Sequence, residues 1–409
     1  DDTLQKAVLL LKDPSDAIHD FAVEKIKSAD YQNHMLLVEY LGLPSTRIRR
    51  GLFKLLETLE IKEFDVLLFA KKNLSRAYEY LAMAQSLENL PQGGIKDLAR
   101  EHFMEKKERV LENILKVLAI HGQNKRMKSA WQGIFSSDTR QRANAIELLN
   151  AVLDKKTFKT MLPLLESPNP STALTEGRKL MKIPAFDTEG KQAVSNLLSS
   201  ADWVDVIFGL GILEETPDIS ISQDLLRNLK QSDNQHILRE LDMIWNKNKK
   251  SGQDNGEDAI QQMSLGEKIL LLKEIEIFSG LSPSELAAIA GVTEEMAYGE
   301  NEDVIKQNSV GETVFLIIEG QVSVIMEREN GNQERIDQMT SGSAFGEMAL
   351  IDDSPRSATI RTMAPCRFLI LHKQEFKETA MEFPRIALQI CSVLSGRIRH
   401  LHSLVQKKE

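Results

Sequence analysis

The spacing of apolar residues changes once along this chain of 409 residues, and that change limits its fold more than any other feature. From Leu4 to about Trp245, apolar side chains recur every three or four positions, as at Ile146 and Leu149, which is typical of amphipathic helices. From Asp303 the period becomes two, and short apolar runs alternate with turn residues. We therefore expect an all-α first domain and a β-rich second domain.

A polar segment separates the two patterns. The sequence NKNKKSGQDNGED, at residues 246–258, has no large apolar side chain and cannot bury enough surface to become ordered. We therefore expect a helical domain at residues 1–245, a linker at 246–263 and a second domain at 264–409. Short helical patterns precede the strands of the second domain, with Ser282 as a predicted N-cap, and a final helix begins at about Pro384.

A loose repeat runs through the helical domain. A turn with Asp or Pro is followed by an apolar or Arg position and then by a small residue, with a period of about 30 residues that predicts a solenoid of helical pairs. An irregular helical bundle is the alternative. The clearest unit, SDTRQRANAIELLNAVL at Ser137–Leu153, resembles the second helix of a HEAT repeat. This resemblance implies an interaction domain that docks a protein partner.

The sequence FGEMALIDDSPRSATI, at Phe345–Ile360, places a carboxylate and a guanidinium around one turn. A cyclic monophosphate carries one negative charge and one free ribose hydroxyl, so a buried pocket for it needs a fixed cation and a fixed acceptor. Arg356 can supply the cation and Glu347 the acceptor. Gly346 allows the backbone to approach a ligand closely, and Pro355 stiffens the segment before the arginine.

This stretch resembles the phosphate-binding cassette of the cyclic nucleotide-binding domain, the module of catabolite activators, kinase regulatory subunits and gated channels. The resemblance covers about residues 277–407 and implies a jelly-roll β-barrel with flanking helices, the last of which folds over the base. It implies that Glu347 binds the ribose 2′-hydroxyl and that Arg356 binds the cyclic phosphate. The other ligand-binding residues that it implies have three roles. Gly346 would let the backbone approach the ligand, and Val324 and Ile336 would line the sugar and base. The amides of Met348, Ala349 and Ser357 would complete the shell.

Several details of this site stay open. Asn308 stands where relatives often carry Gly, but Asn also tolerates a positive φ. Ser357 follows the arginine, where a Thr often favours cGMP and cAMP-selective relatives can carry Ser, so the resemblance implies cAMP and leaves cGMP open. The final helix offers four candidate base contacts that the sequence does not rank: Ile390, Leu394, Arg397 and Ile398. The alternative to ligand binding is that Glu347 and Arg356 pair with each other in an empty barrel, which would make the chain a protein-interaction scaffold.

The order of the domains adds a second resemblance. Together with the segment Glu108–Glu166, it is similar to the soluble region that follows the membrane part of bacterial ATP/ADP-translocase-type nucleotide carriers. This similarity implies a cytosolic regulator of a membrane transporter. The chain begins at Asp1 without an initiator Met, which is typical of a fragment of a longer protein.

Composition narrows the remaining classes of function. The net charge of −9 and the lack of a basic stripe argue against a nucleic-acid partner. No apolar run approaches the ~18 residues that span a bilayer, and no signal peptide is recognisable, so we expect a cytoplasmic protein. Cys366 and Cys391 fit this compartment as two buried free thiols, with one disulfide as the alternative. No nucleophile can be paired with a base and no metal motif is present, so we expect no catalytic residue, no metal and no cofactor besides the ligand.

Overall fold

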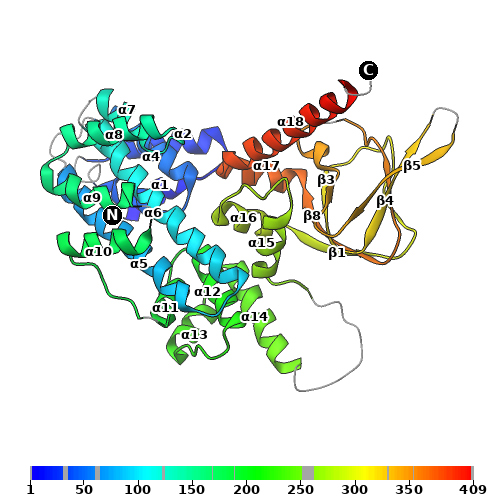
Figure 1. Cartoon of the computed structure of the whole chain (residues 1–409), viewed down its shortest axis with the longest axis horizontal. Helices are drawn as coiled ribbons and strands as arrows, with labels where there is room; N and C mark the ends of the chain where they lie inside the picture. The colour runs from blue at the N-terminus through cyan, green and yellow to red at the C-terminus, as the bar shows by residue number, and fades with distance from the viewer. Residues whose placement is uncertain are drawn as a thin grey trace. The chain divides into compact units, whose positions relative to one another are not determined.

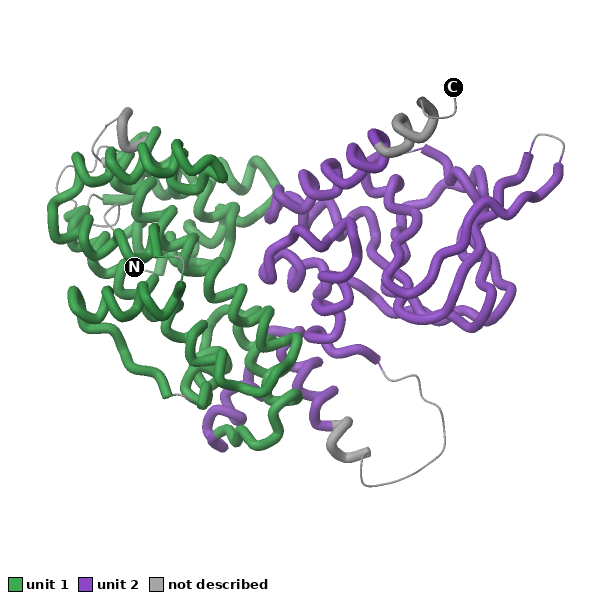
Figure 2. The backbone as a smooth tube through the Cα atoms, in the orientation of Figure 1, with its two compact units in different colours: residues 1–221 green, residues 222–409 purple. Residues whose placement is uncertain are grey.

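The computed structural model describes residues 2–30, 36–59, 65–121, 125–167, 169–187, 189–250, 262–328, 331–352 and 354–406. The chain divides into two compact units, residues 1–221 and 222–409 (Figure 2). The predicted linker at 246–263 lies mostly outside the described residues. The two helices that begin between residue 222 and this linker, Gln223–Lys230 and Gln235–Lys250, belong to the second unit.

The first unit is helical in its described residues, as the apolar spacing predicts (Figure 1). Consecutive helices pack in pairs, namely α1 with α2, α5 with α6, α7 with α8, α9 with α10 and α11 with α12. Its elements are α1 (Asp2–Leu10), α2 (Asp16–Lys27), η1 (Glu39–Gly42), α4 (Thr46–Thr58), α5 (Val66–Ser86), η2 (Leu87–Asn89), α6 (Gly94–His121), α7 (Lys125–Ile134), α8 (Thr139–Val152), α9 (Lys155–Glu166), α10 (Pro170–Leu180), α11 (Lys191–Leu198) and α12 (Trp203–Glu215). The paired packing is compatible with repeated helical pairs, and their assignment to the HEAT class stays a prediction.

Side-chain caps fix where several of these helices begin. The side chains of Ser45, Asp138, Asp154 and Asp202 accept hydrogen bonds from amides in the first turns of α4, α8, α9 and α12. These bonds satisfy donors that have no partner within the helix, and each contributes about 1 kcal/mol.

The second unit combines helices with two antiparallel sheets. The described strands form one sheet in the order β1-β8-β3-β6 and another in the order β2-β7-β4-β5. Its elements are α13 (Gln223–Lys230), α14 (Gln235–Lys250), α15 (Leu265–Glu274), α16 (Pro283–Gly291), β1 (Glu294–Tyr298), β2 (Asp303–Ile305), β3 (Thr313–Glu319), β4 (Gln321–Glu327), β5 (Gln333–Thr340), β6 (Ala344–Phe345), η3 (Glu347–Leu350), β7 (Thr359–Thr362), β8 (Cys366–His372), α17 (Lys373–Glu382) and α18 (Pro384–Gln406). The antiparallel strands confirm the change of period, and closure of the two sheets into a barrel stays a prediction.

Both sheets contribute to one core in the second unit. Phe315, Phe345 and Phe368 come from the first sheet, and Val322 and Ile360 come from the second. Phe345 stacks on Phe315 with ring centroids 5.2 Å apart, and Phe368 meets the Phe345 ring edge-on at 5.6 Å. This cluster fixes the end of β6, from which the cassette begins.

Local predictions in this unit agree with the structure at two positions and differ at one. Ser282 caps α16 in a capping box with Glu285, as predicted. Asn308 has a φ of 63°, so it does adopt the left-handed conformation. Both cysteines are free and Cys366 is buried, but Cys391 is exposed on α18, because it lies on the face of that helix turned away from the buried Ile386 and Ile390.

No helix among the described residues is both long enough and apolar enough to cross a bilayer.

Candidate functional site

The cassette connects the two sheets of the second unit. It leaves the first sheet at the end of β6, forms the short helix η3 and enters the second sheet at Thr359, the start of β7. Gly346 makes the turn between β6 and η3 with a φ of 78°. Because Phe345 is locked in the core, the residues that follow it are held at a fixed place beside β3.

Arg356 is buried, with 8% of its surface exposed. Its Nη1 donates to the Gly346 carbonyl at 3.0 Å, and its Nη2 donates to the Thr313 carbonyl at 2.6 Å and to the Thr313 hydroxyl at 3.3 Å. The Asn308 amide donates to the Arg356 carbonyl, and the Arg356 amide donates to the Ser309 carbonyl. The left-handed turn at Asn308 therefore fixes the arginine backbone, while the two carbonyls fix its guanidinium.

Two glycines make room for this arginine. A Cβ built at Gly311 would overlap the Arg356 guanidinium, and one at Gly346 would lie 2.5 Å from its Nη1. The sequence interpretation gave Gly346 the role of admitting a ligand. The structure adds that Gly346 must lack a side chain for the arginine itself, in addition to its positive φ.

Glu347 is held by the C-terminal helix. Its Oε1 accepts a hydrogen bond from Arg397 Nη1 at 2.9 Å, and only 15% of its side chain is exposed. Arg397 also donates to Glu276 Oε2, at 2.7 Å from Nη2 and 3.2 Å from Nε. Arg397 therefore bridges two carboxylates.

Glu347 and Arg356 lie near each other without forming an ion pair. Burial lowers the pKa of the Arg356 guanidinium, and the nearby Glu347 carboxylate raises that pKa and offsets part of the effect. Each side chain has other hydrogen-bond partners, so the self-paired alternative considered from sequence is not the state of this structure. The Glu347 carboxylate and the Arg356 guanidinium are therefore both available at one site.

The other predicted ligand residues occupy different environments. Met348 is exposed (55%) on η3, and Ser357 is also exposed. The resemblance implied that the Ala349 amide would contact the ligand, but this amide donates to the Gly346 carbonyl at 3.2 Å because η3 closes as a tight turn. Val324 packs partly against the core, whereas Ile336 is exposed (47%) at a register shift between β4 and β5.

Sequence reasoning missed three partners in the site. Ser309 acts through its carbonyl, and Thr313 acts through its carbonyl and its hydroxyl. A carbonyl contact carries no signal in the residue type. Glu276 lies 121 positions from Arg397, and no local pattern links them. Arg397 itself was one of four unranked candidates on the final helix, and the structure distinguishes it by its bond to Glu347.

A buried charged cluster lies in the first unit. Asp205 of α12 accepts hydrogen bonds from His102 Nε2 at 2.6 Å, Lys106 Nζ at 2.5 Å and Ser200 Oγ at 2.6 Å. Asp202, His102 and Asp205 have the donor atoms and proximity of a metal site. The Lys106 ammonium already lies between the two aspartates, 3.2 Å from Asp202, so this cluster has its own cation.

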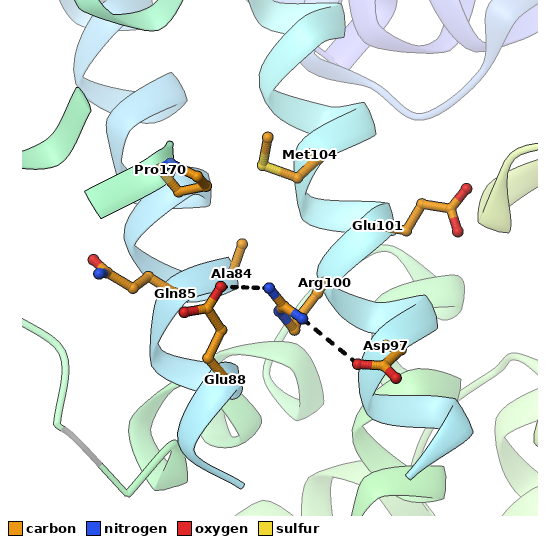
Figure 3. A pocket seen from close by; sticks show the side chains of 8 residues that line it. All are labelled: Ala84, Gln85, Glu88, Asp97, Arg100, Glu101, Met104 and Pro170. Carbon is orange, nitrogen blue, oxygen red and sulfur yellow. Dashed lines mark hydrogen bonds and ion pairs between the residues drawn. The ribbon is translucent and has the colours of Figure 1, made fainter. Parts of the chain in front are cut away.

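The same unit contains a cavity of about 340 Å³, and Figure 3 shows the side chains around it. Its lining residues are Ala84, Gln85, Glu88, Asp97, Arg100, Glu101, Met104 and Pro170. Arg100 is hydrogen-bonded to Glu88, and its Nη1 lies 3.6 Å from Asp97 Oδ1. These two carboxylates neutralise the positive charge that an anionic ligand would need.

Residues 295–383 match the family model of the cyclic nucleotide-binding domain. The second unit contains a cyclic nucleotide-binding domain. This domain includes the whole cassette and the strands β2 to β8, while Arg397 lies beyond the matched residues.

Known proteins resemble the chain over the same region. A cAMP-dependent protein kinase regulatory subunit of Blastocladiella emersonii is 38% identical over 105 residues, which are 26% of this chain and 26% of that protein. A CRP-like cAMP-activated global transcriptional regulator of Mycobacterium tuberculosis is 23% identical over 133 residues, 32% of this chain and 59% of that protein. The catabolite activator protein of Thermus thermophilus aligns with a TM-score of 0.31 and 22% identity, over 32% of this chain and 62% of that chain. The chain thus spans between about a quarter and three fifths of the length of these proteins.

Proposed function

We propose that the cyclic nucleotide-binding domain of this chain binds a 3′,5′-cyclic monophosphate, with cAMP favoured over cGMP, and regulates the rest of the chain. The observation that carries the proposal is that buried Arg356 lies near Glu347 while each side chain is held by other protein groups. The names of the two curated relatives, both of which specify cAMP, support the choice of ligand.

Arg356 can bind a phosphate without leaving its present position. A guanidinium carries five N–H groups, and its three hydrogen bonds to Gly346 and Thr313 leave some of them for phosphate oxygens. The carbonyls therefore orient the cation and do not neutralise it. An oriented, partly desolvated cation loses less conformational freedom when a phosphate arrives, which favours binding.

The wider role follows as part of the same proposal. The helical first unit docks a protein partner, and the chain acts as a cytoplasmic regulator attached to a membrane transporter of the nucleotide-carrier type. The proposal includes no catalysis, no metal, no further cofactor and no nucleic-acid partner, consistent with the net charge of −9. The named relatives regulate a kinase or transcription. They therefore support the choice of ligand and do not indicate which process this chain regulates.

Calorimetric titration of the full chain with cAMP and cGMP tests the proposal. We expect measurable heat with the wild type and a loss of affinity of at least about tenfold in Arg356→Leu and in Glu347→Ala, because each removes a charge-assisted hydrogen bond. Arg385→Leu and Glu300→Ala, which change the same charges at exposed positions, should bind as the wild type does. Absence of heat with both nucleotides at millimolar concentration would reject ligand binding and favour the scaffold alternative.

A further inference from the structure

We propose that Arg397 is a positioning residue of the nucleotide site, which holds the Glu347 carboxylate apart from Arg356 and presents it to the ribose 2′-hydroxyl. This inference rests on the proposed function. It assigns a specific task to one residue of α18, which lies beyond residue 383, where the match to the family model ends.

The geometry gives Arg397 two anchors. Its Nη1 bonds Glu347 Oε1 at 2.9 Å, and its Nη2 and Nε bond Glu276 Oε2 at 2.7 and 3.2 Å. Glu276 lies between α15 and α16 in the chain, so the guanidinium fork connects that segment, η3 and α18. A fork held at both ends has a fixed direction, which a lysine ammonium with the same charge would lack.

Electrostatics explain why Glu347 needs such a partner. Arg356 lies close enough for the Glu347 carboxylate to raise its pKa, and both side chains are largely removed from water. At such a site opposite charges attract more strongly than they do in water. The bonds of Arg356 to the two carbonyls leave some of its N–H groups unused, and these N–H groups could bond to Glu347. The competing bond from Arg397 keeps Glu347 from forming an ion pair with Arg356.

Arg397 can hold Glu347 and leave it active as an acceptor. An ionised carboxylate has two oxygens and about four lone-pair directions. The bond from Arg397 uses Oε1, which leaves Oε2 for a ribose hydroxyl. The arginine and the nucleotide can therefore share one carboxylate, and the same residue joins the ligand to α18.

The test compares cAMP with 2′-deoxy-cAMP in calorimetric titrations of the full chain. The wild type should prefer cAMP, because only cAMP offers the hydroxyl that Glu347 accepts. In Arg397→Gln we expect cAMP affinity to fall about tenfold and the preference for cAMP over 2′-deoxy-cAMP to fall toward one. Arg397→Lys should restore part of the preference. Arg399→Gln removes an exposed arginine of the same helix and should preserve both the affinity and the preference.

Two further variants keep the test decisive. Glu276→Gln removes the second anchor while leaving Arg397 and the cassette intact, and it should reduce the preference to an intermediate value. Arg397→Gln should add little to the loss already caused by Glu347→Gln, because both act through the same carboxylate.

The outcomes separate this inference from the proposed function. If the wild type binds cAMP and Arg397→Gln weakens both nucleotides equally, Arg397 supports the fold alone and the inference is overturned. Unchanged binding in Arg397→Gln overturns it as well. If the wild type binds neither nucleotide, the proposed function itself fails, whatever the variants do.

Discussion

Replacing Gly311 by alanine should displace the arginine on which the site depends. The added Cβ would overlap the Arg356 guanidinium, whereas the backbone at Gly311 does not have a positive φ and tolerates alanine. Moving the guanidinium breaks its bonds to the carbonyls of Thr313, at 2.6 Å, and Gly346, at 3.0 Å. Hydrogen bonds to a charged group contribute about 1.5–3 kcal/mol each, and water recovers part of that, so we expect a loss of about 3 kcal/mol.

Differential scanning calorimetry of the full chain measures this loss. For a unit of this size, about 3 kcal/mol lowers the Tm by roughly 6–12 °C, and the shift should be confined to the transition of the second unit. The matched control is Gly396→Ala in α18, where a Cβ meets nothing within 4 Å and should stabilise the helix slightly. In an Arg356→Leu background, Gly311→Ala should cost much less. If Gly311→Ala proves as stable as Gly396→Ala, the arginine is not held as described.

Two further predictions concern the buried cluster of the first unit. In urea unfolding, Asp205→Asn should lower the free energy of unfolding by about 3–5 kcal/mol, because Lys106 loses the carboxylate that it is buried against. Asp224→Asn, at an exposed site, is the control and should leave that free energy unchanged. Equal losses in the two variants would contradict this prediction. Burial opposes protonation of His102, but hydrogen bonds to Asp205 and Glu105 outweigh it and raise its pKa. The stability that protonated His102 contributes is therefore complete below about pH 6.5 and is lost as the pH rises through the raised pKa. Urea unfolding between pH 6 and 9 should show a smaller decline in His102→Gln than in the wild type, and identical slopes would refute the assignment.

The sequence was informative where the cause of a structure lies within a few residues. The change of apolar period predicted the helical and strand regions, because burial of one face imposes that period directly. Ser282 and Asn308 were predicted from the cap and the positive φ that their own side chains allow. The cassette was predicted as a unit because Gly346, Glu347 and Arg356 follow one another around one turn.

Contacts between distant residues could not be predicted in this way. An arginine on a surface helix has the same local pattern whether it faces solvent or, as Arg397 does, bridges Glu276 and Glu347. The same holds for His102 and Asp205, which meet across 103 positions of chain. Strand order has the same limit, since β1 pairs with β8 and nothing local to either strand specifies the other.

The contrast between the two cysteines has a practical consequence. Cys366 is enclosed at the start of β8, while the thiol of Cys391 is open to solvent on α18, about 1.7 turns before Arg397. A maleimide fluorophore should therefore attach to this helix in the native chain without any engineered site. The dye would report, through its emission or its distance to a second label, whether α18 moves when a nucleotide is added.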